Sequence, residues 1–193
     1  MSSVRDDFED YQVLELMIKS KAEGSTAIAF GPLGTLETES ETESIEKKAE
    51  GKVIKSKTRV SKLNVNITGH ATVPTKRIVW GFDTSNLKDG VYAYGSDVPS
   101  TGLIITAKVV DMEGNVKYIA YPNVSNVSGL KFNIEDDQTE IAMNEMEFSA
   151  NADEDNRFYY EAYADEIDAS IATQWLTNFS TDLVSNGETS TGD

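Results

Sequence analysis

The chain has few side chains that could perform catalysis or bind a metal. His70 is its only histidine and cysteine is absent, so a hydrolytic triad, a thiolate nucleophile or a zinc site lacks its usual residues. Carboxylates remain, because 33 Asp and Glu allow many pairs at the roughly 5 to 10 Å used in glycoside hydrolysis. No spacing singles out one pair. We therefore expect a structural His70 and no catalytic residue, metal site or cofactor.

Two short motifs resemble ligand-binding loops without their essential residues. Asp111–Asn115 lacks the ligand spacing and the closing glutamate of a calcium loop, and it is better explained as a hairpin connection in which Gly114 supplies a positive φ. Gly31–Thr35 contains no lysine for a phosphate and has a proline within it. Neither motif predicts a ligand.

Composition limits the class of protein. The 193 residues suffice for one domain with a buried core, and 39% hydrophobic content is lean for such a domain. Such a low hydrophobic content fits a core completed by neighbouring subunits, and equally an ordinary domain with a flexible loop and tail. No apolar run approaches the roughly 20 residues that cross a bilayer, and Met1–Asp10 has no signal-peptide core. We expect a soluble protein made in the cytoplasm, with no membrane partner.

Acidic residues dominate the last third of the chain. The net charge is −16, and between Lys131 and Asp193 there are 16 acidic residues against Lys131 and Arg157, a balance of −14. Such a field repels nucleic acid. The alternative is that the acids only keep the protein soluble.

The segment Tyr118–Tyr163 is typical of amphipathic strands separated by acidic turns. Apolar and polar residues alternate with a period of two in three stretches, Leu130–Glu135, Ala142–Ala150 and Arg157–Tyr163. The last stretch is also rich in aromatic residues, which suit a pleated surface. Three strands joined by two turns predict a meander in a mainly β (α+β) protein.

Other strands and two helices are expected around this meander. Strands are predicted at Lys55–Thr68, Leu103–Val110 and Val116–Tyr121, and helices at about Thr75–Leu87 and Asp165–Phe179. The apolar phase shifts near Ser61, which predicts a bulge. Pro122 is expected to end its strand, and Phe8–Ile18 fits either a helix or a strand.

The segment 31–54, with the residues that follow it, is unusually charged. An acidic run precedes a basic one, and the residues concerned include Glu37, Glu39, Glu41, Glu43, Lys47, Lys48, Lys52 and Lys55. Because it has too few apolar residues to pack, we expect a long mobile loop or a hairpin tip. Acid on one arm and base on the other could dock on a second copy of the chain. The alternative is a solvated arm whose charges pair locally.

Three stretches carry a resemblance to a known family. They are Val116–Pro122, which ends in Tyr-Pro, then Phe132–Thr139, and then Glu145–Asp155, with Glu-Phe-Ser-Ala leading to acidic residues. Together with the charged segment before a strand ending at Gly69, and a central helix, this layout over Leu63–Tyr163 resembles the major tail tube protein of long-tailed, non-contractile phages of Gram-positive bacteria.

The resemblance implies a fold and an assembly. It implies a β-sandwich or barrel-forming sheets with a flanking helix, occupying 1–182, with an N-terminal arm at 1–20 and a disordered tail at 183–193. Copies would close into hexameric rings by pairing sheets across subunits. The rings would stack into the virion tail tube through which DNA passes at infection, after assembly in the host cytoplasm.

The resemblance also implies partners and roles for the charged residues. The partners would be further copies of this chain and other tail proteins, namely the tape measure, tail terminator and distal tail proteins. The segment 31–54 would reach the adjacent ring. Acids on one strand face, with Glu145, Glu147 and Glu135 as candidates, would line the lumen and keep phosphates from binding.

A different class of function fits part of the sequence. A monomeric surface or carbohydrate-binding β-sandwich would use exposed aromatic residues to stack on sugars, the candidates being Tyr92, Tyr94, Tyr159 and Tyr163. Such a protein would need a signal peptide or anchor, and neither is visible. A carboxylate-based hydrolase is a third, weaker alternative.

Overall fold

The computed structural model of the chain describes residues 7–49, 52–96, 102–134, 136 and 140–186, with the backbone alone at 47–49 and 52–53. The elements in chain order are β1 Gln12–Ser20, β2 Ile28–Ala29, β3 Leu33–Ala49, β4 Lys52–Gly69, α1 Val73–Val79, β5 Leu103–Val110, β6 Val116–Asn126, β7 Asn144–Ala150, β8 Tyr160–Tyr163, α2 Ala169–Asn178 and α3 Thr181–Val184. The expected mainly β (α+β) fold is confirmed.

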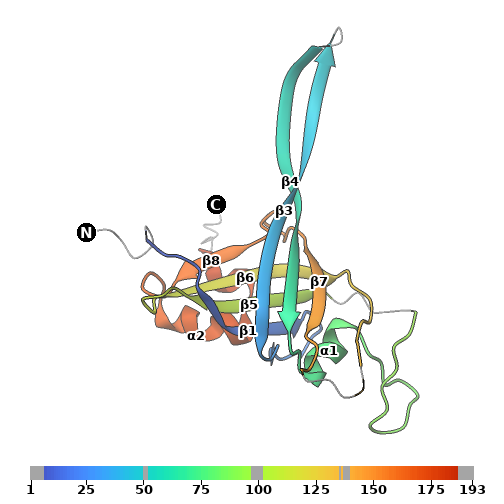
Figure 1. Cartoon of the computed structure of the whole chain (residues 1–193). Helices are drawn as coiled ribbons and strands as arrows, with labels where there is room; N and C mark the ends of the chain where they lie inside the picture. Colours follow the sequence, from blue (N-terminus) through green and yellow to red (C-terminus); the bar gives the residue numbers. More distant parts are fainter. Residues whose placement is uncertain (1–6, 50–51, 97–101, 135, 137–139, 187–193) are drawn as a thin grey trace, which may run out of the picture.

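All eight strands belong to one antiparallel sheet. Its order is β2-β1-β5-β6-β7-β4-β3, and β8 also pairs with β6. The long β6 makes this possible, because Lys117–Ala120 pairs with β8 while Val124–Asn126 pairs with β7 on the same side. Figure 1 shows β3, β4 and β7 lying across β1, β5 and β6. The sheet therefore folds over itself into two layers.

The two layers enclose one hydrophobic core. The inward positions alternate along each strand, as a half-buried strand requires, and they include Leu16 and Ile18 of β1, Val65 and Ile67 of β4, Ile105 of β5, Tyr121 of β6, and Met146 and Phe148 of β7. Each fully buried side chain of this kind contributes roughly 1.5–3 kcal/mol relative to exposure.

Helix α2 covers the outer face of β5 and β6. Trp175 and Phe179 are buried there against Ala120, and the Trp175 indole Nε1–H donates to the carbonyl of Ile119 at 3.0 Å. The expected helix at 165–179 is confirmed with a later start, since Asp168 is its N-cap.

Helix α1 is shorter than expected. Thr72 caps it by accepting from the Thr75 amide, and a proline stands in its first turn. It ends at Val79, because Gly81 has a φ of 63° and leaves the helical region. The predicted extension to Leu87 was wrong.

One strand prediction in the meander was wrong. Leu130–Ile134 is irregular, because β7 already pairs with β4 on one side and with β6 and the Val127 and Ser128 amides on the other. Although its apolar and polar residues alternate, this stretch therefore pairs with no strand in the described part of the chain.

The predicted end of a strand at Pro122 was also wrong. Pro122 lies within β6, at a register shift between the pairs Leu103↔Val124 and Ile105↔Tyr121, where no backbone amide is needed for strand pairing.

The chain ends also differ from expectation. The segment predicted as an N-terminal arm contains β1, which lies between β2 and β5 and buries Leu16 and Ile18. At the other end, Leu183 and Val184 belong to α3, so the predicted tail starts too early, and 187–193 lie outside the described residues. Alternating burial along β1 is the feature that decides its strand form.

Candidate functional site: the acidic face and the charged hairpin

The predicted loop at 31–54 is a long β-hairpin formed by β3 and β4. The register runs from Leu33↔Gly69 to Ala49↔Lys52, and Figure 1 shows the distal half projecting far from the body. Threonine and serine alternate with the charged residues along β3, a pattern typical of a strand. The backbone groups of β3 and β4 pair with each other along the hairpin, so the distal half forms without a hydrophobic core. Ser61 is unpaired between Glu41↔Lys62 and Thr42↔Val60, so the predicted bulge is confirmed.

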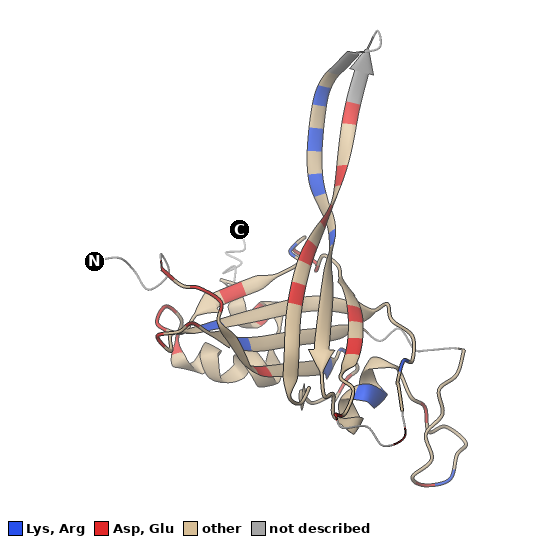
Figure 2. Cartoon of the chain, in the orientation of Figure 1, with Lys and Arg blue, Asp and Glu red and all other residues tan. Residues whose placement is uncertain are grey.

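One face of the sheet at the base of this hairpin is polar and acidic. Directly opposed residues share a face, and two rows cross three strands, Glu37–Asn66–Glu147 and Thr35–Thr68–Glu145. The intervening residues face the core. We call this surface the acidic face, and Figure 2 shows acidic positions in red on β3 and β7 at the base of the hairpin. Its members are Thr35, Glu37, Glu39, Glu41, Lys62, Asn64, Asn66, Thr68, Glu145, Glu147 and Ser149.

The carboxylates of the acidic face are solvated and only partly balanced. Glu37, Glu39 and Glu147 are exposed, and among the described residues only Glu147 has a cation close enough to interact with it, namely Lys131. Lys131 Nζ contacts Glu145 Oε2 at 2.6 Å, and this hydrogen bond raises the pKa of Lys131. The surface can therefore repel phosphates.

Farther from the body, oppositely charged side chains of β3 and β4 form ion pairs with each other. Arg59 Nη2 lies 2.9 Å from Glu43 Oε2, and Lys62 Nζ lies 3.2 Å from Glu41 Oε2. Such exposed pairs contribute about 0–1 kcal/mol each. Local pairing, the alternative to docking on another copy, thus accounts for two of the predicted loop acids.

The distal half of β4 is basic, and one of its cations, Arg59, belongs to these pairs. Lys55, Lys57 and Arg59 are exposed on β4, and Lys55 pairs in register with Lys47. The side chains of Lys47, Lys48 and Lys52 lie outside the description. The hairpin is therefore acidic near the body, and toward its tip the cations of β4 lie beside Glu43 and Glu46 of β3.

The free edge of β3 is a second notable feature. Among the described residues, β3 pairs with β4 alone, although it has 17 residues. An exposed edge of this length presents unpaired amides and carbonyls to another chain, and charged side chains protect it from indiscriminate pairing.

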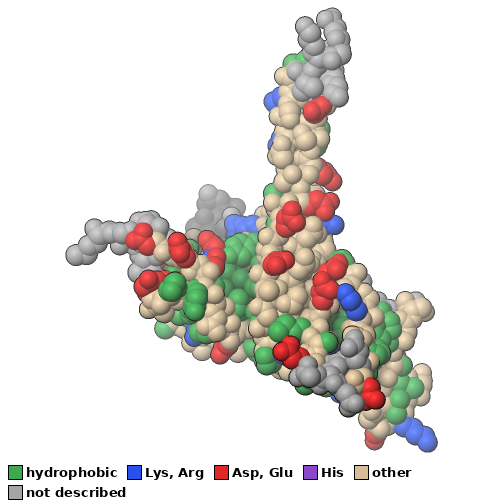
Figure 3. All heavy atoms as spheres, in the orientation of Figure 1, with side chains coloured by type: hydrophobic (Ala, Val, Ile, Leu, Met, Phe, Trp, Pro, Cys, Tyr) green, Lys and Arg blue, Asp and Glu red, His purple; other side chains and the backbone are tan. Residues whose placement is uncertain are grey.

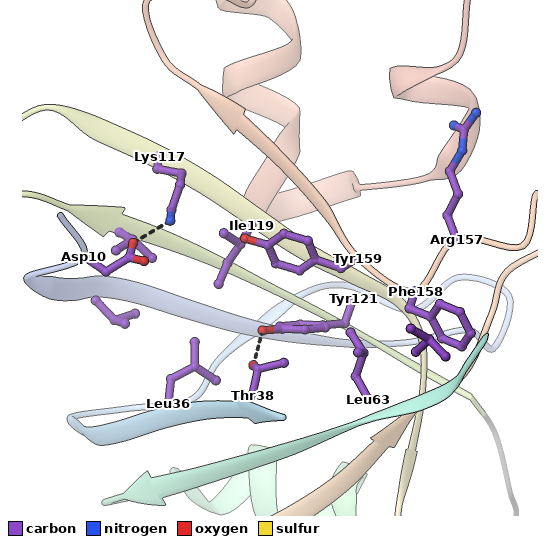
Figure 4. Close-up of a pocket in the computed structure, with 13 residues that line it drawn as sticks. Asp10, Leu36, Thr38, Leu63, Lys117, Ile119, Tyr121, Arg157, Phe158 and Tyr159 are labelled. Carbon is purple, nitrogen blue, oxygen red and sulfur yellow. Dashed lines mark hydrogen bonds and ion pairs between the residues drawn. The ribbon is translucent and has the colours of Figure 1, made fainter. Parts of the chain in front are cut away.

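A cleft of about 680 Å³ opens between the two layers beside the hairpin (Figure 4). The buried Lys117 reaches Asp10 at 2.5 Å, and the Tyr121 hydroxyl bonds that of Thr38 at 2.5 Å. Burial raises the pKa of Tyr121 and, together with a hydrogen bond to Glu161, that of Tyr159. Both phenols stay protonated near neutral pH, so neither acts as a base.

The four tyrosines considered for sugar binding stack within the chain. Arg77 lies 3.4 Å above the Tyr92 ring. The ring centroids of the other three lie 5.3–5.9 Å from Phe82, Tyr121 and Phe8. Tyr92 and Tyr94 lie in the loop after α1, whereas Tyr159 and Tyr163 lie just before and at the end of β8.

The remaining features concern His70, metal ligands and membrane-spanning helices. The His70 amide donates to the Pro32 carbonyl at 2.8 Å, where Gly31 and Gly69 allow close approach of the backbone. In the parts of the chain that the structure describes, no cluster of three or more potential metal ligands occurs. No described helix is long and apolar enough to cross a membrane.

The structure unites residues that the sequence kept in separate proposals. Glu145 and Glu147, predicted for the lumen, share a face with Glu37, Glu39 and Glu41, which were assigned to the loop. Glu135 lies outside the described residues. The odd-numbered glutamates of β3 were a usable signal for a strand face, but their position beside β7 depends on long-range pairing.

Comparisons with known proteins identify no family for this chain. A scan against protein-family models and a search of curated proteins found no match. Among solved structures, the chain is similar to one from "Cryo-EM structure of the anti-feeding prophage (AFP) baseplate, 6-fold symmetrised", with a TM-score of 0.43 and 9% identity over 84% of this chain and 97% of that one. A similarity this distant assigns no function.

Proposed function

We propose that this chain is a structural virion protein that assembles into stacked rings, six-membered by the family resemblance, to form a phage tail tube. The observation that carries the proposal is the combination, in one sheet, of an acidic face and a long hairpin that leaves the body. A lone soluble domain has no evident use for either feature. A tube needs a wall that does not bind DNA and a contact between rings.

The acidic face would line the lumen. It has five glutamates in two clusters, Glu37–Glu41 and Glu145–Glu147, against Lys62 and Lys131 close by. Negative charge at the wall opposes condensation of the phosphate backbone on it and lets DNA slide. On one side, the face ends at the free edge of β3, where a neighbouring subunit could continue the sheet.

The hairpin would join successive rings. Its distal half has exposed side chains on every described residue beyond Glu41 and before Ser61, so little within the chain holds it. Its basic segment suits the acidic surface of a copy in the next ring. Contact with tape measure, terminator and distal tail proteins would follow from the tube's ends and interior.

Electron microscopy of the purified chain tests self-assembly. Negative staining over a range of protein concentration and salt should show rings or hollow tubes. Salt should speed their growth, because it screens repulsion within a chain of charge −16. Slower growth with salt would indicate that hairpin ion pairs dominate. Monodisperse small particles under all conditions would contradict the proposal and favour a monomeric module.

The position of the acidic face has a separate test. Tubes of the Glu145→Lys, Glu147→Lys variant should retain DNA in a gel-shift or co-sedimentation assay, whereas unmodified tubes should not. Asp182→Lys, an exposed change on α3, is the control for added positive charge. A tube map with Glu145 and Glu147 on the outer wall would refute this assignment while leaving the tube itself intact.

A further inference from the structure

An apolar cleft lies at the end of the body that carries α1. It has a volume of about 720 Å³ and lies between α1, the loop near Tyr92 and the chain on either side of 135–139. Its exposed apolar side chains are Val73 at 56% exposure, Phe132 at 65%, Ile134 at 83%, Ile141 at 82% and Met143 at 56%. Exposed apolar patches of this kind mark binding surfaces in soluble proteins.

The charges of this apolar cleft are mostly positive. Among the described residues that line it, Lys76, Arg77 and Lys131 are positive and Glu145 alone is negative, and Lys131 pairs with Glu145 at 2.6 Å. Arg77 stacks on Tyr92 at 3.4 Å, which fixes its guanidinium beside the cleft. The chain as a whole is strongly acidic, so a cationic apolar surface stands apart from the rest of it.

The opposite end of the body carries the complementary properties. Tyr11, Leu14 and Met112 are exposed there, at 64%, 49% and 74%, and the Tyr11 amide bonds to the Val110 carbonyl, which brings the start of β1 beside the β5–β6 turn. Exposed carboxylates surround them, namely Asp7, Glu9, Asp10, Glu15 and Glu113. We call this surface the acidic end, and Figure 3 shows apolar side chains among acidic ones on it.

The two surfaces lie where a ring would need them. Figure 1 places the start of β1 and the β5–β6 turn at one end of the layered body and α1 at the other, with the acidic face between them and the hairpin projecting sideways to this direction. Unlike surfaces at opposite ends generate head-to-tail contacts, which close into rings when the rotation allows.

We propose that the acidic end of one copy docks in the apolar cleft of the next, with Met112 and Tyr11 against Phe132 and Ile134, and Glu9 and Glu113 near Lys76 and Lys131. The occupant is a second copy of this chain because its charge and apolar content match the cleft. The inference rests on the proposed ring assembly and names its lateral interface, which is distinct from the hairpin contact between rings.

Site-specific cross-linking tests this interface, and the absence of cysteine makes it clean. The Met112→Cys, Phe132→Cys double variant, assembled and treated with a short bifunctional thiol reagent, should give a ladder of covalent oligomers up to the ring size. Each single variant should assemble but give no covalent ladder. The matched control, Gln174→Cys with Phe132→Cys, uses an exposed position on α2 and should give no ladder.

Charge exchange provides a second measurement should a cysteine variant fail to assemble. Glu9→Lys with Glu113→Lys, and separately Lys76→Glu with Lys131→Glu, should each reduce ring formation at least tenfold, and their combination in one chain should restore it. Assembled rings without the ladder or the rescue would overturn the interface and leave the proposed function standing. An unmodified chain that never assembles would overturn both.

Discussion

The base and the distal half of the β3–β4 hairpin differ in what holds them. At the base, Val65 and Ile67 are buried against β7 and the opposite layer. Distally, Ile45 and Ile54 are exposed at 54% and 62%, and the strands are joined by backbone pairing, a surface ion pair and a hydrogen bond between the Ser44 and Ser56 hydroxyls. The base is thus part of the domain, whereas the described side chains of the distal half are not buried by it.

Removing the distal half should separate assembly from folding most sharply. Replacing 43–59 by Asn-Gly, a favoured two-residue hairpin turn, removes no side chain that is buried among those described, at 43–46 and 54–59. We expect the midpoint of thermal unfolding to stay within a few degrees of the parent value, while tubes disappear from micrographs. Tubes of normal length from the shortened chain would refute a role for the hairpin between rings.

Truncation of a core residue at the base should do the opposite. Ile67→Ala leaves a cavity between the layers, because Ile67 is fully buried, and the expected loss of unfolding free energy is about 2–5 kcal/mol. The matched change Ile54→Ala, on the same strand but exposed, should cost less than about 0.5 kcal/mol. Chemical denaturation of both variants measures this. Equal losses would mean that the distal strands pack on the body.

The same contrast explains what could be predicted from the sequence. Leu103–Val110, α2 and the bulge at Ser61 follow from local apolar periodicity, and all three were found. The segment 31–54 has no apolar periodicity, so it was expected as a long mobile loop or a hairpin tip, while a strand was expected from Lys55 onward. Its strand form depends on pairing between β3 and β4.

Two other differences have a long-range cause. Leu130–Ile134 has strand alternation but finds no strand partner among the described residues, and the acidic face exists only because β4 separates β3 from β7. Whether a stretch has a partner strand, and which strands lie side by side, is not encoded within a short window of sequence. Glu145 and Glu147 were nevertheless correctly expected to point away from the apolar residues of their strand.

In the body, a carboxylate held by hydrogen bonds should make stability depend on pH. Asp153 is desolvated by burial, but hydrogen bonds from Tyr160 and the amides of Arg157 and Asp155 outweigh this and lower its pKa below 3.8. A lowered pKa in the folded state gives stability that is present above pH 3.8 and lost as the pH falls below it.

Asp153→Asn should therefore cost about 1 kcal/mol at pH 7, with the difference from the parent shrinking as the pH falls toward 3. Urea unfolding at several pH values measures it. Glu154→Gln, an exposed neighbour, should leave stability at pH 7 unchanged. A cost for Asp153→Asn that is constant with pH would mean that its hydrogen bonds do not depend on ionisation.

The smallest effect is expected from the hairpin ion pairs. Arg59 and Glu43 are 61% and 53% exposed and lie 2.9 Å apart, so Arg59→Gln should change the unfolding free energy by less than about 1 kcal/mol, and less still in high salt. A double-mutant cycle with Glu43→Gln isolates the pair. The same variants should alter the salt dependence of tube growth, because Arg59 belongs to the basic segment proposed to meet the next ring. A large stability loss with unchanged assembly would reverse the contrast, placing the distal hairpin in the domain and leaving the contact between rings to other surfaces.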